Sequence, residues 1–267
     1  MIVYLPPLWY NTESFQEKNS VIIILGGLFL IGYWSYTVIL TYLGLVSAFT
    51  GIVFSVLFAT GEIISSVIFP LGCLLICGFC DMFDGRVART KKNRSEDEKN
   101  FGMQIDSLCD LVCFTVLPAT LGFCLGGNCI LAAVAGATLI LAGVVRLAYF
   151  NVEEMKRRSD PENDDHTYTG LPVTSTALLI PVLFLFKDFT GSMFSTFYQI
   201  SLIIIAVLFV LNFKLPKPGP RGILIMTVVS CTTICVLARS WYILIPVAPF
   251  LFVGIYMFIK NRKHEKS

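Results

Sequence analysis

The stretch that decides the fold runs from residue 80 to residue 114 and reads CDMFDGRVARTKKNRSEDEKNFGMQIDSLCDLVCF. It contains four aspartates, and both pairs lie at the edge of very apolar segments: Asp81, Asp84, Asp106 and Asp110. A charged side chain inside a bilayer costs about 2.5–3.5 kcal/mol on insertion scales. Four carboxylates at such a boundary would also repel one another, so their grouping favours one or two bound divalent metal ions.

The composition around this stretch is that of an integral membrane protein. Of the 267 residues, 55% are hydrophobic and only 14% are charged, and the mean hydropathy is +0.75. These values exclude an ordinary soluble domain. We therefore expect an all-α fold, a polytopic bundle of transmembrane helices in a lipid bilayer, with no nucleic-acid partner.

Apolar runs divide the chain into about eight spans, with six to nine as the range, because a spanning helix needs about 20 apolar residues. The runs cover roughly 37–59, 63–84, 106–124, 128–150, 171–187, 196–213, 221–238 and 241–259. Residues 20–60 carry no charged side chain, which is enough length for two spans. Three glycines (26, 27 and 32) weaken the first of these, so we expect an interfacial or half-inserted helix at 20–34.

Lys and Arg residues are concentrated in four segments that this division places on one side of the membrane. These segments are 86–99, 151–170, 214–221 and the C-terminal tail, whereas the opposite side carries only Lys187 and Arg239. The positive-inside rule therefore predicts that the four segments are cytoplasmic. The aspartates flank the first of them, so we expect the site to face the cytoplasm at about the surface of the cell membrane.

The nine cysteines fall mostly inside apolar runs at helical spacing. They are interpreted as small packing residues rather than as a disulfide or zinc framework. Cys73, Cys77 and Cys80 precede Asp81 on one predicted helix, which leaves open a thiol near the metal site.

The spacing of the aspartates places each pair on one helical face. Asp81 and Asp84 are three residues apart, and Asp106 and Asp110 are four apart. Two neighbouring helices could thus form a cage of four carboxylates, which suits Mg²⁺, Mn²⁺ or Ca²⁺. A single aspartate would be interpreted as a helix cap or as the partner of a loop arginine, but four at these spacings favour the metal site.

Small and basic residues accompany the aspartates. Gly85 and Gly102 permit a bulky ligand to approach the backbone, and Ala88 keeps the same face small. Arg86 and Arg89 add positive charge. Metals together with basic residues indicate a phosphate or pyrophosphate ligand.

The whole pattern resembles the signature of the CDP-alcohol phosphotransferases. It reads Asp81-x-x-Asp84-Gly85-x-x-Ala88-Arg89 and then Gly102-x-x-x-Asp106-x-x-x-Asp110, and all eight fixed positions match. Twelve residues separate Arg89 from Gly102, a longer insert that is typical of the serine-using branch. Further segments resemble the same branch over about 37–185: DSLCDLVCFTVLPA (106–119), VRLAYFNVEE (145–154) and YTGLPVTSTA (168–177).

This resemblance implies transfer of a phosphatidyl group from CDP-diacylglycerol to L-serine, which gives phosphatidylserine and CMP. It implies one or two Mg²⁺ or Mn²⁺ ions, with Ca²⁺ as a further bound ion, and a homodimer. By resemblance the four aspartates are the metal ligands, and Asp110 is also the general base. The residues implied in binding the CDP-lipid are Asp81, Gly85, Ala88, Arg89 and Gly102. The domains implied are an N-terminal extension (1–35), a catalytic core (36–188) and C-terminal transmembrane helices with a basic tail (189–267).

The residues expected to hold the acceptor alcohol are Arg146, Gly170 and Pro172. An arginine at the end of a span is either a headgroup anchor or a binding group for a carboxylate or phosphate. Gly170 and Pro172 open the next span and could equally be an ordinary helix start. Tyr149 stands where the serine branch often carries a second basic residue.

Two alternatives to the serine transferase stay open. The acceptor could be glycerol 3-phosphate or inositol phosphate, with the same chemistry. The protein could also be an ion or metal transporter, since carboxylates inside membranes mark ion paths. The position of the aspartates at the membrane edge, rather than at the midplane, argues against a transporter.

Overall fold

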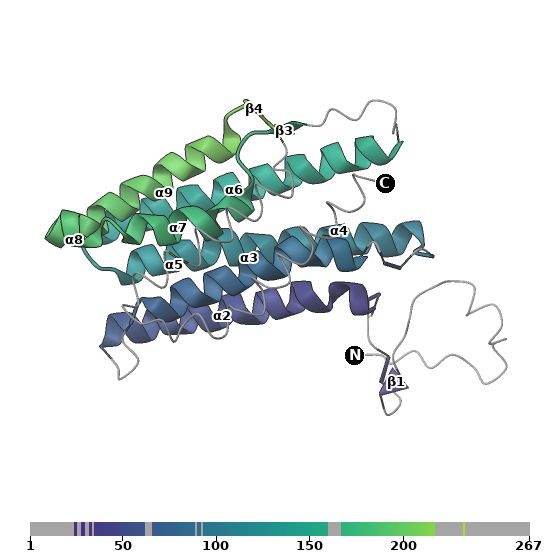
Figure 1. The fold of residues 1–267 in the computed structure, drawn as a ribbon, viewed down its shortest axis with the longest axis horizontal. Coiled ribbons are helices and arrows are strands. Elements are labelled where there is room, and N and C mark those ends of the chain that lie inside the picture. Colours follow the sequence, from purple (N-terminus) through teal and green to yellow (C-terminus); the bar gives the residue numbers. More distant parts are fainter. Residues whose placement is uncertain are drawn as a thin grey trace, which may run out of the picture.

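The computed structural model describes residues 24–25, 28–29, 32–33, 35–61, 66–88, 90–91, 93–159, 167–216 and Thr232. Most of them form helices that run along one common axis (Figure 1). Within these residues, five helical segments are long and apolar enough to cross a membrane: Tyr36–Thr60, Ile68–Ala88, Glu96–Cys124, Cys129–Arg158 and Lys187–Val210. The protein is therefore an integral membrane protein with a polytopic helical bundle, as the sequence predicts.

The first two long helices form a hairpin. A 3₁₀ turn, η1 (Tyr36–Val38), leads into α2 (Ile39–Thr60), which ends at Gly61 in the left-handed conformation with φ of 73°. The second helix, α3 (Ile68–Ala88), continues one turn beyond Asp84. Gly51 lets these helices approach closely, because a Cβ there would lie 2.9 Å from the Cβ of Cys73.

The third long helical segment, Glu96–Cys124, begins in the charged stretch that follows α3. Ser95 caps α4 (Glu96–Leu111) by accepting a hydrogen bond from the Glu98 N–H at 3.1 Å. Three acidic residues in the first turn also stabilise this end of the helix, because their negative charge interacts favourably with the positive end of the helix dipole. The span predicted at 106–124 therefore starts ten residues earlier, and Asp106 and Asp110 lie in the helix interior.

A π-helix interrupts this segment directly after the second aspartate pair. The π-helix η2 (Val112–Val116) joins α4 to α5 (Leu117–Cys124), and Pro118 lies at the start of α5. Such single π turns are frequent at functional sites.

The fourth long helix, α6 (Cys129–Ser159), has 31 residues. The span predicted at 128–150 therefore ends too early, because the first nine residues of the segment 151–170 continue the helix. Ion pairs within the last turns support this extension, among them Arg158 Nε to Glu154 Oε1 at 3.3 Å.

The chain then returns through shorter elements. A 3₁₀ turn η4 (Val173–Ser175) and α7 (Thr176–Phe184) are followed by α8 (Lys187–Thr190), η5 (Gly191–Met193) and α9 (Phe194–Val210). The span predicted over 171–187 is thus not one continuous helix, since α7 has only nine residues and contains Pro181. Proline lacks the N–H that the helical ladder needs. The spans predicted at 221–238 and 241–259 lie outside the described residues.

Short strands occur at two places. β1 (Ile24–Leu25) pairs with β2 (Leu28–Phe29), so these four residues contradict the interfacial helix predicted at 20–34. The sequence between them is Gly-Gly, which favours a two-residue hairpin turn over a helix. β3 (Thr167–Thr169) pairs with β4 (Lys214–Pro216) and joins the entry of α7 to the end of α9.

The core and the outer surface are both apolar. Buried residues such as Phe114, Leu117 and Tyr198 fill the centre of the bundle. Tyr198 satisfies its hydroxyl by donating to the Pro118 carbonyl at 3.1 Å. Large side chains on the outside of α2, including Phe49 at 65% exposure, form the surface expected to face lipid.

Candidate metal centre

Three carboxylates meet between α3 and α4. Asp81 and Asp84 from α3 and Asp106 from α4 each offer an oxygen, and these oxygens lie within 4.8 Å of one another. At that separation two ionised carboxylates repel by about 3–4 kcal/mol if the effective dielectric constant is about 20. A divalent cation between them would turn this repulsion into attraction.

The unpaired oxygens fit a metal ion. Asp106 Oδ1 is buried and has no hydrogen-bond partner among the described residues. Asp84, which is 7% exposed, accepts a hydrogen bond from Thr41 Oγ1 to its Oδ2 at 3.3 Å. Buried acceptors normally have a partner, so a buried oxygen without one, beside two further carboxylates, is suited to be a ligand of a cation. Carboxylate oxygens are the donors that Mg²⁺, Mn²⁺ and Ca²⁺ prefer.

Asp110 lies apart from this group of three. It is buried one helical turn farther along α4, and with Asp81 and Asp84 it lines a small cavity. The predicted cage of four carboxylates is therefore arranged as a group of three, Asp81, Asp84 and Asp106, with Asp110 beside two of them on the wall of the same small cavity.

Thiols and small groups form the rest of the cavity wall. Four cysteines take part, and the remaining lining residues are Thr41 and Gly44: Cys77, Cys80, Cys109 and Cys113. Cys77 donates its thiol hydrogen to the Gly44 carbonyl at 3.3 Å. Four of the described cysteines are buried, which fits the packing role predicted for them, whereas Cys129 is exposed.

The two signature glycines differ in their surroundings. A Cβ added at Gly85 would meet nothing within 4 Å, so this side of α3 is open. A Cβ at Gly102 would lie 2.7 Å from Nη2 of Arg94, so the end of that side chain occupies the space above the glycine. Ala88 is half-buried at the end of α3, and Arg89 lies outside the described residues.

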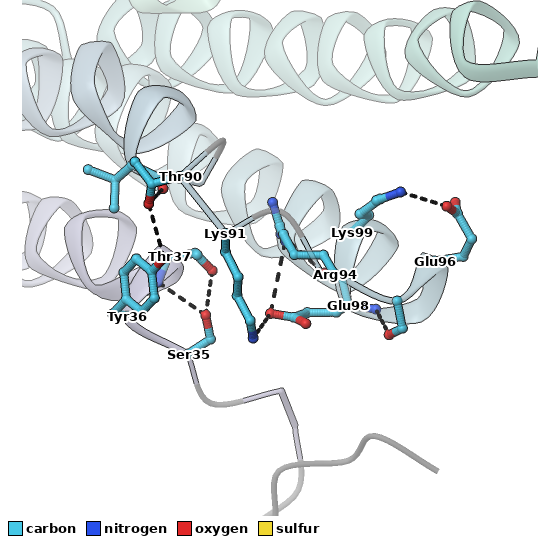
Figure 2. Close-up of polar contacts among 11 residues, drawn as sticks. Ser35, Tyr36, Thr37, Thr90, Lys91, Arg94, Glu96, Glu98 and Lys99 are labelled. Atoms are coloured by element: carbon cyan, nitrogen blue, oxygen red, sulfur yellow. Dashed lines mark hydrogen bonds and ion pairs between the residues drawn. The ribbon is translucent and has the colours of Figure 1, made fainter. Parts of the chain in front are cut away.

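The polar loop before α4 forms a network of its own (Figure 2). Glu98 accepts a hydrogen bond from Lys91 Nζ at 2.7 Å, and its Oε1 lies 3.9 Å from Arg94 Nε. The hydroxyl groups of Tyr36 and Thr90 are 3.0 Å apart, which links the loop to η1. Nothing in the sequence pattern pointed to these contacts.

Arg146, the predicted acceptor residue, is buried and bonded to the next segment. Its side chain donates from Nε to the Leu171 carbonyl at 3.1 Å and from Nη2 to the Gly170 carbonyl at 3.5 Å. Gly170 has φ of 75°, and its N–H donates to the Phe213 carbonyl at 2.6 Å. Pro172 is extended and precedes η4. The structure thus brings the arginine together with the 170–172 segment.

The contacts of α6 with α4 place Arg146 at the level of Asp110. Three residues before the arginine, a Cβ at Gly143 would overlap Cγ2 of Thr115 and lie 3.5 Å from Leu111. Five residues after it, Asn151 accepts a hydrogen bond from Ser107 at 2.8 Å. Arg146 therefore lies between these two contacts along the antiparallel helices.

Comparison with known proteins shows which proteins this chain is similar to. The family model described as CDP-alcohol phosphatidyltransferase matches residues 34–213, which include both aspartate pairs and Arg146. The chain is 37% identical over 108 residues to a CDP-diacylglycerol–serine O-phosphatidyltransferase of Saccharomyces cerevisiae, covering 40% of this chain and 38% of the relative. It is 29% identical over 160 residues to the protein of the same name from Helicobacter pylori, covering 57% and 63%.

A third relative is an archaetidylserine synthase of Methanothermobacter thermautotrophicus, 28% identical over 150 residues, covering 56% of this chain and 58% of the relative. The chain thus spans less than two thirds of the length of each of these relatives. No solved structure matches the chain.

Proposed function

Because the chain belongs to the CDP-alcohol phosphatidyltransferase family, we propose that it transfers a phosphatidyl group from CDP-diacylglycerol to the hydroxyl of L-serine, releasing CMP. The observation that carries the proposal is the group of three carboxylate oxygens within 4.8 Å, with one buried oxygen left without a partner. The relatives named for serine transfer support the choice of acceptor.

In this proposal Asp81, Asp84 and Asp106 hold Mg²⁺ or Mn²⁺ as one or two ions, and Asp110, which lines the same cavity as Asp81 and Asp84, is a further ligand. The metal, when bound, would neutralise charge on the diphosphate and the leaving phosphate. The serine oxygen forms a bond to the phosphorus that carries diacylglycerol, and the bond from that phosphorus to CMP breaks. Asp110 accepts the hydroxyl proton, since it lies beside the cavity but outside the group of three.

The remaining site residues divide between the two substrates. The open side of α3 at Gly85, with Ala88, Arg89 and Gly102, binds the nucleotide part of the CDP-lipid. Arg146 binds the serine carboxylate, and its bonds to the 170–171 backbone fix the direction of its fork.

The cellular setting is proposed from the charge distribution and the resemblance. The catalytic core covers 36–188, the protein lies in the cell membrane as a homodimer, and the site faces the cytoplasm. The basic last turn of α6, with Lys156, Arg157 and Arg158, lies at the same end of the bundle as the start of α4 (Figure 1).

The decisive experiment measures CMP release from CDP-diacylglycerol by the purified protein in detergent, with serine, glycerol 3-phosphate and inositol phosphate as separate acceptors. We expect release with serine, loss of activity with a chelator and its return with Mg²⁺ or Mn²⁺. Release only with one of the other acceptors would change the acceptor and keep the chemistry. No CMP release with any acceptor, together with metal uptake into vesicles, would favour a transporter instead.

A further inference from the structure

The side chain of Arg94 is largely covered, and its Nε is buried without a hydrogen-bond partner among the described residues. Its side chain is 14% exposed, and Nε has no hydrogen-bond acceptor among the residues that the structure describes. Nη2 donates to the Glu98 carbonyl at the long distance of 3.4 Å. An arginine carries five N–H donors, and burying them without acceptors is unfavourable.

The nearby acid forms only a long ion pair with this arginine. Glu98 Oε1 lies 2.7 Å from Lys91 Nζ but 3.9 Å from Arg94 Nε, so its closer partner is the lysine (Figure 2). The Lys91–Glu98 ion pair therefore fixes the segment before α4 to the helix. The Nε–H group of Arg94 stays available to hydrogen-bond another acceptor.

The guanidinium of Arg94 lies about one helical turn from the metal centre. Nη2 lies 2.7 Å from where a Cβ on Gly102 would be. Gly102 is four residues before Asp106 on α4, so the two positions share a helical face and differ by about 6 Å along the axis. Arg94 therefore lies about one helical turn from Asp106, on the side of the charged loop, whereas Arg146 lies level with Asp110.

We propose that Arg94 binds the diphosphate of the CDP-lipid from the Gly102 side of α4, and that the Lys91–Glu98 pair positions its loop. This inference rests on the proposed function. A diphosphate supplies several anionic oxygens, and the planar fork of arginine matches phosphate oxygens with paired hydrogen bonds. The absence of a side chain at Gly102 then has a second reason, because any Cβ there would displace the guanidinium.

The test compares binding of CDP-diacylglycerol in mixed micelles, and its KM, between the wild-type full-length protein and Arg94→Ala. We expect the dissociation constant and the KM for CDP-diacylglycerol to rise by about 10- to 100-fold, as for the loss of hydrogen bonds to a charged group. The KM for serine should change by less than about threefold, within the effect of a surface charge. Arg94→Lys keeps the charge but lacks the fork, so it should show an intermediate loss.

The matched control is Lys99→Ala, which removes a positive charge from the first turns of α4, close to Arg94 in the sequence. Lys99 pairs with exposed Glu96 at 2.7 Å and has no contact with Gly102, so its KM values should stay at the wild-type level. If both variants were active and had the same KM for CDP-diacylglycerol, the inference about Arg94 would be overturned and the proposed function would stand. A lower Tm and kcat with an unchanged KM for CDP-diacylglycerol would also overturn the inference, because that pattern indicates a purely structural arginine. A wild-type protein that neither binds nor consumes CDP-diacylglycerol would overturn the proposed function, and this inference with it.

Discussion

Asp84 combines burial, a hydrogen bond from Thr41 and membership of the carboxylate group. We expect Asp84→Asn to reduce kcat/KM by more than tenfold, which corresponds to about 1.4 kcal/mol of transition-state stabilisation. The amide oxygen can still accept from Thr41, so folding should be preserved, but the charge that holds the metal is lost. Steady-state CMP release and thermal unfolding measure the two effects separately.

Asp97→Asn is the control for that substitution, because Asp97 is exposed in the first turn of α4. It should retain wild-type turnover. An Asp84→Asn enzyme that kept more than a tenth of the activity would contradict the role of this carboxylate as a metal ligand.

Arg146 has a structural role and a proposed binding role. Substitutions at this position test the first through protein stability and the second through the KM values. Arg146→Ala leaves the carbonyls of Gly170 and Leu171 without their donor, so we expect a stability loss of about 1–3 kcal/mol. The KM for serine should also rise by about 10- to 100-fold, as for a lost charged hydrogen bond. The KM for CDP-diacylglycerol should change much less, and Arg146→Lys should restore only part of the serine affinity. Loss of CDP-diacylglycerol affinity with intact serine affinity would instead assign Arg146 to the lipid phosphate.

Helix packing around the site depends on glycines at close contacts. A Cβ on Gly143 of α6 would overlap the methyl group of Thr115, whose hydroxyl is bonded to the Leu111 carbonyl at 2.6 Å. We expect Gly143→Ala to lower stability by about 1–3 kcal/mol through overpacking. Gly72→Ala in α3 is the matched control, since a Cβ there meets nothing within 4 Å. It should be neutral or stabilise by up to about 1 kcal/mol. Equal Tm values for the two variants in detergent would refute this account of the contact.

The sequence predicted the long helices and the position of the aspartates because both depend on local pattern. Apolar runs and three- or four-residue spacing identify helical faces without knowledge of neighbours. The extension of α6 to Ser159 was also accessible, since Glu153 and Glu154 precede Arg157 and Arg158 at the spacing of helical ion pairs.

Other features depend on contacts between distant residues and could not be predicted. The bond from Thr41 to Asp84 joins positions 43 residues apart. The placement of Arg94 above Gly102 depends on how the loop folds back onto α4. The separation of Asp110 from the other three carboxylates depends on how α3 and α4 pack, which residue spacing does not give.

For the whole molecule, the proposed orientation in the membrane decides on which side the metal centre lies. Residues 125–128, between α5 and α6, lie at the end of the bundle opposite the last turn of α6, because α6 runs from one end to the other. In a protein without its native cysteines, Lys156→Cys should be unreactive to an impermeant thiol reagent added to intact cells. Asn128→Cys, at an exposed position, should react. Labelling at residue 156 and protection at residue 128 would reverse the orientation and move the site to the outside.

The π-helix at Val112–Val116 gives the segment Glu96–Cys124 one residue more than an α-helical path with the same number of turns would hold. Each residue of an α-helix turns the chain by about 100°. If an unbroken α-helix had to hold this additional residue, α4 would be rotated by about that angle relative to α5. Asp106 and Asp110 would then point away from α3, although every side chain of the metal centre were still present. The wider π turn takes up the residue locally, so the backbone geometry of this interval, and not only the identity of its residues, keeps half of the carboxylates facing α3.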